Sequence, residues 1–356
     1  MGKKSATADY ELVGGAPVAA SHCRVRSALL LSALAASLCA AYALFYRSPP
    51  AAGGPDCSSA ALTLSASPSH VTDGGDLVVS WAFASLSGAA CNASREDFLT
   101  LSCGPVSGDH DYFQRRNVSD ADATPTSVRF ADLYMMRCTY VVKYFAAARG
   151  AQPAAELRVS TRDAPSAPKH GHLAFSARDD EMVVMFNSAS RRTPRVRFGV
   201  RPELLALEAS GASTTYAAAD MCHEPATTTS QLAFRDPGFM HTVVLSGLLP
   251  DQLYFYRFGN DADGWSRVQS FRSKPPPGAR TAKFIAYGDM GVDSAPAAQS
   301  TAVRVFEDVV GDGYDAFLLH VGDVSYARGK AHVWDKFFHL IEPIATRVPY
   351  MVSIGN

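Results

Sequence analysis

The chain carries almost no net charge. Its 33 Lys and Arg residues balance 34 Asp and Glu residues over 356 positions, which leaves a formal charge of −1. A nucleic-acid-binding protein needs a basic stripe, and none is visible, so the sequence gives no electrostatic reason to expect nucleic acid or an anionic surface as a partner. The length predicts two or three domains, because single hydrophobic cores stop growing at shorter lengths.

The N-terminus lacks the myristoylation pattern, since Ala6 stands where that pattern requires Ser or Thr. It has instead an uncharged run at 27–46, rich in Leu and Ala, which is long enough as a helix to cross about 30 Å of hydrocarbon. Basic residues precede the run and only Arg47 follows it closely, so we expect 1–26 in the cytosol and the rest in the lumen or outside. The alternative is a cleaved signal peptide with a small-residue site at 41–43. Either way, the domains that follow enter the secretory route.

Two further features agree with export. We therefore expect a membrane-anchored or secreted protein. Asn92 and Asn117 each begin an N-glycosylation triplet, although such triplets also arise by chance. The cysteines that follow the apolar run are Cys57, Cys91, Cys103, Cys138 and Cys222. In an oxidising compartment the first four can form two disulfides with three possible connectivities, and Cys222 is left unpaired or buried. The other interpretation of these cysteines is buried free thiols.

Residues 57–162 are predicted to form a β-sandwich of the fibronectin III or immunoglobulin-like kind, attached through a Pro/Gly-rich tether at 48–56. Short β-branched and aromatic segments alternate with turn signals, and no helical period is present. The expected strands are 62–64, 76–83, 98–103 and 138–145. Trp81 is expected to be a core residue of this domain.

A second β-sandwich is predicted at 166–273, after a Pro-rich linker at 163–168 and before a stiff spacer at 275–278. The expected strands are 172–176, 181–186, 195–200, 241–245, 253–258 and 267–271. Beyond the spacer the pattern changes to alternating strands and helices. Strands at 283–287, 316–321 and 350–354 flank helices at 297–310 and 332–341, which is typical of an α/β domain with a parallel sheet.

Each of these last three strands ends with glycine followed by an oxygen ligand. The pairs are Gly288-Asp289, Gly322-Asp323 and Gly355-Asn356, and Tyr326 follows closely. Because right-handed β-α-β connections bring successive carboxyl ends to one sheet edge, we expect these side chains to converge. A single Gly-Asp pair is usually only a turn, but three at matching positions indicate a site for hard cations. The close Cys/His spacing of structural zinc sites is absent.

The stretches around these pairs are similar to the first three motif blocks of the purple acid phosphatases, in particular the plant-type large form. These are exported enzymes of the calcineurin-like metallophosphoesterase superfamily. The similar segments are 288–291, 322–329 and 355–356, followed by 334–350, and in the preceding sandwich 220–222, 235–241, 247–250 and 254–256. The resemblance implies that 281–356 opens an αββα-sandwich phosphoesterase domain and that 166–273 is the family's N-terminal β-sandwich.

The resemblance also implies roles. Asp289 would bind Fe(III), Asp323 would bridge it to a second divalent metal (Fe, Zn or Mn), Tyr326 would be the phenolate ligand, and Asn356 would bind the second metal. Such a pair of cations clamps a phosphate and generates hydroxide at low pH, which suits hydrolysis of phosphate monoesters. No catalytic residue is assigned, because the histidine that follows the third block in the family would lie beyond Asn356.

The family draws three further histidine ligands from later blocks, so we expect the chain to stop before this domain is complete and to bind metals poorly as written. His320 is expected to be packed in its strand, and His339 to lie on a half-buried helix. Two alternatives to an acid phosphatase stay open. One is a nucleotide pyrophosphatase or phosphodiesterase, and the other is a non-catalytic surface binding protein with an incomplete phosphoesterase domain.

Overall fold

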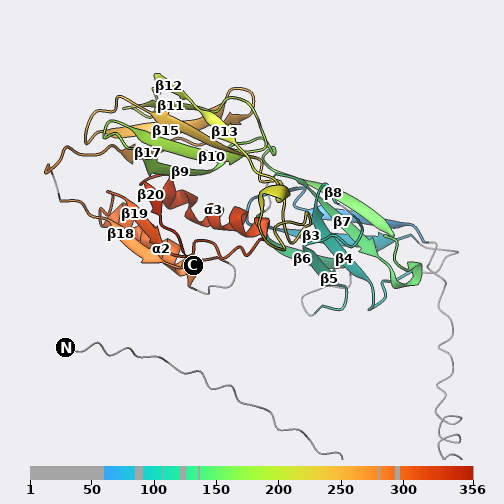
Figure 1. The fold of residues 1–356 in the computed structure, drawn as a ribbon. Coiled ribbons are helices and arrows are strands. Elements are labelled where there is room, and N and C mark those ends of the chain that lie inside the picture. The colour runs from blue at the N-terminus through green and yellow to red at the C-terminus, as the bar shows by residue number, and fades with distance from the viewer. Residues whose placement is uncertain are drawn as a thin grey trace, which may run out of the picture. The chain divides into compact units, whose positions relative to one another are not determined.

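The computed structural model describes residues 60–84, 91–106, 108–120, 126–134, 137–279, 281–292 and 297–355 (Figure 1). The apolar run at 27–46, Cys57 and Asn356 lie outside the described residues. Within the described part, no helix has both the length and the apolar character needed to cross a bilayer. The proposed span at 27–46 therefore stays a prediction.

Two sheets form the first sandwich, in the strand orders β1-β3-β6 and β2-β8-β7-β4-β5. The strands are β1 (Leu62–Ser67), β2 (His70–Val71), β3 (Gly75–Phe83), β4 (Phe98–Cys103), β5 (Gln114–Asn117), β6 (Ser127–Leu133), β7 (Thr139–Phe145) and β8 (Ala155–Thr161). Leu77, Val79 and Trp81 alternate along β3 and are all buried, as the two-residue period of a strand requires. Trp81 meets Tyr144 of the other sheet edge-on, with ring centroids 5.6 Å apart, which confirms Trp81 as a core residue.

A disulfide joins Cys103, at the end of β4, to Cys138, just before β7, with Cα atoms 5.5 Å apart. Cys91 is disulfide-bonded as well. These pairings select among the connectivities that the sequence left open, and they rule out buried free thiols at these three positions. Cys222 is unpaired, as expected, and it is exposed.

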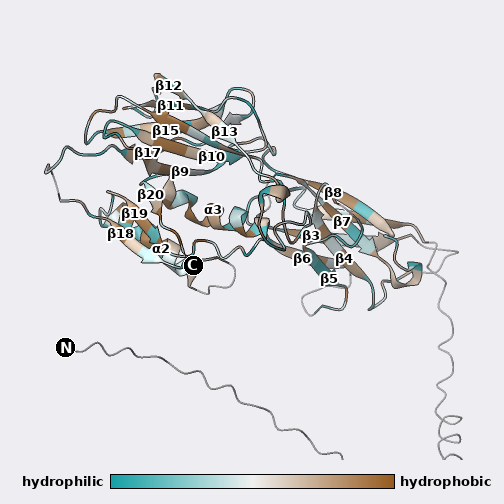
Figure 2. Cartoon of the chain, viewed as in Figure 1, coloured by the Kyte–Doolittle hydropathy of each residue, from teal (hydrophilic) through white to brown (hydrophobic). Residues whose placement is uncertain are grey.

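The second sandwich again pairs two sheets, with strand orders β13-β14-β10-β9 and β12-β11-β15-β16, and β17 beside β15. The strands are β9 (Lys169–Phe175), β10 (Met182–Ser188), β11 (Arg195–Gly199), β12 (Leu207–Ser210), β13 (Ala212–Thr214), β14 (Phe239–Leu245), β15 (Leu253–Asn260), β16 (Gly264–Trp265) and β17 (Gln269–Arg272). Figure 2 shows β10 as a largely apolar strand. The two sheets bury one cluster that includes Val184, Val243, Tyr256 and Phe258.

The C-terminal part is a parallel sheet in the order β18-β19-β20. Its elements are β18 (Ile285–Gly288), α2 (Ala298–Gly311), β19 (Leu318–Val321), α3 (Ala331–Ala345) and β20 (Tyr350–Val352). The predicted alternation of strands and helices is confirmed. The predicted end of the last helix at 341 is wrong, because α3 continues through Pro343 to Ala345. Ile344 and Ala345 are both buried, so packing of this last turn offsets the hydrogen bond that proline cannot make.

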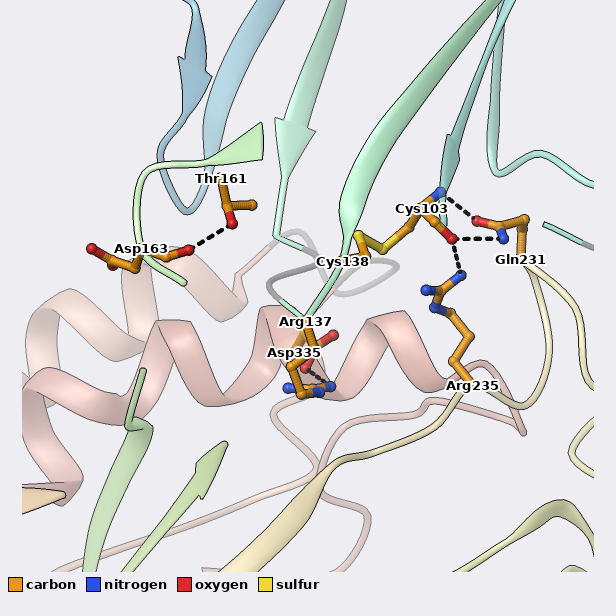
Figure 3. Close-up of a disulfide and its surroundings, with 8 residues drawn as sticks. All are labelled: Cys103, Arg137, Cys138, Thr161, Asp163, Gln231, Arg235 and Asp335. Carbon is orange, nitrogen blue, oxygen red and sulfur yellow. Dashed lines mark hydrogen bonds and ion pairs between the residues drawn. A yellow bond between two sulfur atoms is a disulfide. The ribbon is translucent and has the colours of Figure 1, made fainter. Parts of the chain in front are cut away.

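Helix α3 connects the parts of the described chain. On one side Glu342 accepts a hydrogen bond from the backbone N–H of Gly171 in β9, at 2.9 Å. Beside its last turn, the Tyr256 hydroxyl donates to the carbonyl of Thr346 at 2.7 Å. Near its start, Asp335 forms a buried ion pair with Arg137, which directly precedes Cys138 (Figure 3). The helix that follows the candidate site is thus held by both sandwiches.

Candidate metal centre at the carboxyl edge of the parallel sheet

Two acidic residues lie at the carboxyl ends of neighbouring parallel strands. Asp289 directly follows the last residue of β18, and Asp323 lies two residues beyond the end of β19. The register pairs Gly288 with Val321, which places both ends at the same edge of the sheet. This is the edge at which open parallel sheets bind their ligands.

The side chain of Asp289 is the centre of this cluster. Its Oδ1 accepts a hydrogen bond from the backbone N–H of Asp323 at 3.1 Å and another from the Tyr326 hydroxyl at 3.0 Å. The structure therefore brings together Asp289, Asp323 and Tyr326, as the sequence predicted. The fourth candidate, Asn356, lies outside the described residues.

Glycines at the strand ends make this approach possible. A Cβ on Gly322, whose φ is +81°, would lie 2.9 Å from Asp289 Oδ1. A Cβ on Gly355 would lie 2.1 Å from Asp323 Oδ1, closer than atoms can pack. The space left by these two glycines is therefore occupied by carboxylates, which explains the glycines at positions 322 and 355; a Cβ on Gly288 would instead lie 2.8 Å from the carbonyl oxygen of Val321.

The backbone around the cluster adopts conformations that side chains usually avoid. Asp289, Tyr326 and Arg328 have φ values of +51°, +53° and +48°. The left-handed region is uncommon for residues other than glycine, and Tyr and Arg lack the local hydrogen bonding that eases it for Asp. Such strain concentrates at functional sites, where the surrounding structure maintains it. The strained loop between β19 and α3 is thus a second indication that this edge has a function.

The surroundings of Tyr326 favour its protonated form. Desolvation raises the pKa of Tyr326, and its hydrogen bond to Asp289 raises it further. By contrast, the carboxylate of Asp323 receives no hydrogen bond from any other described residue, so it is available to a ligand.

His320 lies beneath the cluster and has a structural role. It is fully buried, and desolvation lowers the pKa of His320 below its usual value. Its Nδ1 is 2.7 Å from the Tyr350 hydroxyl, and its Nε2 accepts from the backbone N–H of Met290 at 3.4 Å. Both ring nitrogens are therefore engaged within the protein, which confirms that this histidine is packed in its strand. His339 is half-buried on α3, also as expected.

The three side chains of the cluster could supply some of the ligands of a hard-cation site. Asp289, Asp323 and Tyr326 supply two carboxylates and one phenol, all oxygen ligands of the kind that hard cations prefer. No group of three or more His, Cys, Asp or Glu side chains suited to a metal occurs among the described residues. The described cluster is limited to these three oxygen-bearing side chains, and their assignment as metal ligands stays a prediction.

Trp334 of α3 is a site residue that sequence reasoning did not single out as functional. It lines the same open pocket of about 790 Å³ as Asp323 and Tyr326, and its side chain is partly exposed. The helical period of the sequence predicts the face of the helix on which Trp334 lies. It does not predict which loop packs against that face. Only the packing of α3 against the edge of the sheet places the indole here.

Comparison with known proteins finds one family match in the second sandwich. Residues 168–273 match the family described as the N-terminal domain of purple acid phosphatase. A protein named probable inactive purple acid phosphatase 9, from Arabidopsis thaliana, is 34% identical over 209 residues, which cover 56% of this chain and 32% of that protein. A human protein named acid phosphatase type 7 is 33% identical over 197 residues, covering 54% of this chain and 41% of that protein. The chain thus spans about a third to two fifths of the length of the curated relatives it matches.

A solved structure of similar fold covers most of the chain. The purple acid phosphatase PPD1 from yellow lupin seeds superposes with a TM-score of 0.62 over 83% of this chain and 57% of that one. The sequence identity is 22%, so this likeness concerns the fold alone.

Proposed function

Because the chain belongs to the purple acid phosphatase family, we propose that it hydrolyses phosphate monoesters at a centre of Fe(III) and a second divalent metal (Fe, Zn or Mn). The observation that carries this proposal is the convergence of Asp289, Asp323 and Tyr326 at one strained sheet edge, with Asp289 Oδ1 accepting hydrogen bonds from both of the others. The identity of the metals and the reaction are inferences from family membership and from this donor set.

In this proposal Asp289 and Tyr326 would hold the ferric ion, Asp323 would serve as a ligand to both cations, and Asn356 would hold the second. Such a pair of cations, when bound, supplies Lewis acidity and a clamp for phosphate oxygens. The chain's own residues prepare this site. Gly322 and Gly355 let the carboxylates approach, Asp323 N–H fixes the orientation of Asp289, and the Trp334 indole bounds the pocket in which the ester would lie.

A second candidate function is supported by the relatives. Four similar Arabidopsis thaliana proteins, 33 to 36% identical to this chain, are named probable inactive purple acid phosphatases. The second candidate is therefore a protein that binds a phosphate ester without turning it over. A phosphodiesterase or nucleotide pyrophosphatase remains the alternative within the enzyme class, and no described residue distinguishes it from a monoesterase.

The proposed location of the catalytic part is the lumen or the cell exterior, whether the chain is membrane-anchored or secreted. Asn92 is exposed and Asn117 is partly exposed, so both acceptor positions are accessible to glycosylation. The disulfides at Cys91 and at Cys103–Cys138 agree with an oxidising compartment.

Replacing Asp323 by Asn is expected to lower kcat/KM for p-nitrophenyl phosphate at acidic pH by about a hundredfold or more, because a proposed ligand of both cations would be lost. Even substitutions of residues that only contact a metal ligand typically lower metal affinity or activity by about ten- to a hundredfold. The assay uses protein supplied with Fe(III) and Zn(II). The matched control is Asp261→Asn, an exposed carboxylate of the second sandwich, which is expected to leave the rate unchanged. If the parent protein binds phosphate but does not hydrolyse the ester, the non-catalytic candidate is correct. Full activity in the Asp323 variant would exclude this residue from the centre.

A further inference from the structure

A single cationic side chain lies at the rim of the candidate metal centre. Arg328, in the loop between β19 and α3, lines the open pocket of about 790 Å³ that also contains Asp323 and Tyr326. Among the described residues that line this pocket, Arg328 is the only one with a positively charged side chain. Its charge acts on the Tyr326 hydroxyl, where it opposes the rise in pKa that desolvation causes. The guanidinium group is therefore a neighbour of the proposed ligands.

The side chain of Arg328 has no partner within the described part of the chain. It is exposed, and it forms neither an ion pair nor a hydrogen bond with any other residue described. By contrast, the exposed Arg304 of α2 pairs with Asp308 at 2.7 Å. The donors of the Arg328 guanidinium group therefore remain available to a ligand.

The backbone that carries this side chain is held against the second sandwich. Just after the loop, the backbone N–H of Ala331 donates to the carbonyl of Ala233 at 3.0 Å. Gly329 lies directly against another turn, since a Cβ on it would be 2.9 Å from the backbone nitrogen of Ala226. These contacts help to keep Arg328 at its φ of +48°, a conformation that persists only where the surroundings enforce it.

The simpler interpretation of Arg328 is an ordinary solvated side chain, because most arginines lie at the surface. Such a side chain needs no strained backbone, since almost any loop conformation leaves it in water. The strain at position 328 instead agrees with a guanidinium group that must lie at one point of the pocket rim. Guanidinium groups bind carboxylate and phosphate oxygens through two parallel hydrogen bonds, so an anionic group is the natural ligand.

We propose that Arg328 is a specificity-determining residue that selects phosphate esters whose leaving group carries a second anionic group. This inference rests on the proposed function of the neighbouring centre. The ester phosphate would lie at the cluster of Asp289, Asp323 and Tyr326, and Arg328 would bind the second group, a carboxylate or a further phosphate. An ester with a neutral leaving group would lack this contact and would bind more weakly.

The proposal is tested by isothermal titration calorimetry of the full chain, supplied with Fe(III) and Zn(II), with three phosphonates that cannot be hydrolysed as esters. Phenylphosphonate has no second charged group, 4-phosphonobenzoate adds a carboxylate, and 1,4-benzenediphosphonate adds a second phosphonate. The para position keeps the added group away from the metals that bind the first. At least one of the two substituted compounds is expected to bind about fivefold more tightly than phenylphosphonate, the upper range for an exposed ion pair. The tighter of the two identifies the second group.

Three variants assign the preference to this side chain. Arg328→Asn removes the charge and keeps a residue that tolerates positive φ, so the preference is expected to fall below about twofold. Arg328→Lys keeps the charge and is expected to retain part of the preference. The matched control is Arg267→Asn, an exposed arginine of the second sandwich, which is expected to leave the preference unchanged. Thermal unfolding establishes that each variant is folded.

The outcomes separate this inference from the proposed function. A parent protein that binds none of the three phosphonates would contradict the proposed function, and the role of Arg328 with it. Equal binding of all three, or a full preference in the folded Arg328→Asn variant, would overturn only the role of Arg328. The parent protein gives a second measurement that needs no substitution, since about 0.5 M NaCl screens exposed charges and should abolish most of the preference. A preference unaffected by salt would also overturn the assignment.

Discussion

Replacing Asp335 by Ala is expected to lower the free energy of unfolding by about 3 to 5 kcal/mol, as is typical when one partner of a buried ion pair is removed. The Arg137 and Asp335 side chains are only 17% and 10% exposed, and Arg137 Nη2 lies 2.6 Å from Asp335 Oδ1. Without Asp335, the guanidinium stays buried with Asn187 as its remaining side-chain partner. Denaturant unfolding followed by far-ultraviolet circular dichroism measures the change.

The matched control for this variant is Asp180→Ala. Asp180 pairs with Arg178 at 2.9 Å, but both side chains are well exposed, at 38% and 66%. Such surface pairs typically contribute less than about 1 kcal/mol. If the two variants lose similar stability, the contact between the first sandwich and α3 is not the buried junction described above.

Removing the disulfide, as Cys103→Ala with Cys138→Ala, is expected to lower the free energy of unfolding by about 4 kcal/mol. The bond closes a loop with a sequence separation of 35, for which chain entropy alone predicts a loss of this size. The consequence extends to the second sandwich, because the backbone of Cys103 receives hydrogen bonds from Gln231 at 3.0 Å and from Arg235 at 3.1 Å (Figure 3). Gln231 also accepts from the Cys103 N–H at 2.7 Å.

The control for this pair of substitutions is Cys222→Ala, which alters a free, exposed thiol and is expected to change stability by no more than about 0.5 kcal/mol. Denaturant unfolding under non-reducing conditions compares the three proteins. A loss below about 1 kcal/mol in the double variant would show that the disulfide constrains neither the loop nor the junction.

A clear apolar period helps to reveal a strand in the sequence, although β6 and β8 have one and were not predicted. β3 is a strand that was predicted in this way, because its buried side chains alternate with more exposed ones. Several strands were not predicted, namely β2, β5, β6, β8, β12, β13 and β16, and all of them except β8 lie at sheet edges. β5 reads Gln-Arg-Arg-Asn, and it is a strand only because β4 supplies its hydrogen-bonding partner. Tertiary pairing decides such segments, and a single sequence does not contain it.

One part of the candidate site could also be predicted from the sequence, and another part could not. Convergence of Asp289 and Asp323 follows from strand order and handedness, so the sequence was sufficient to predict it. The contacts of α3 with both sandwiches were not predictable in this way. Arg137 and Asp335 are separated by 198 positions, and nothing in the local pattern of either indicates its partner.

The most direct test of the proposed centre is the visible absorption of the chain titrated with Fe(III). Phenolate coordination by Tyr326 predicts a charge-transfer band that grows with added iron, is lost in Tyr326→Phe and is kept in Tyr112→Phe, a tyrosine of the first sandwich. A band of unchanged intensity in Tyr326→Phe would contradict the assignment of this sheet edge as the metal site.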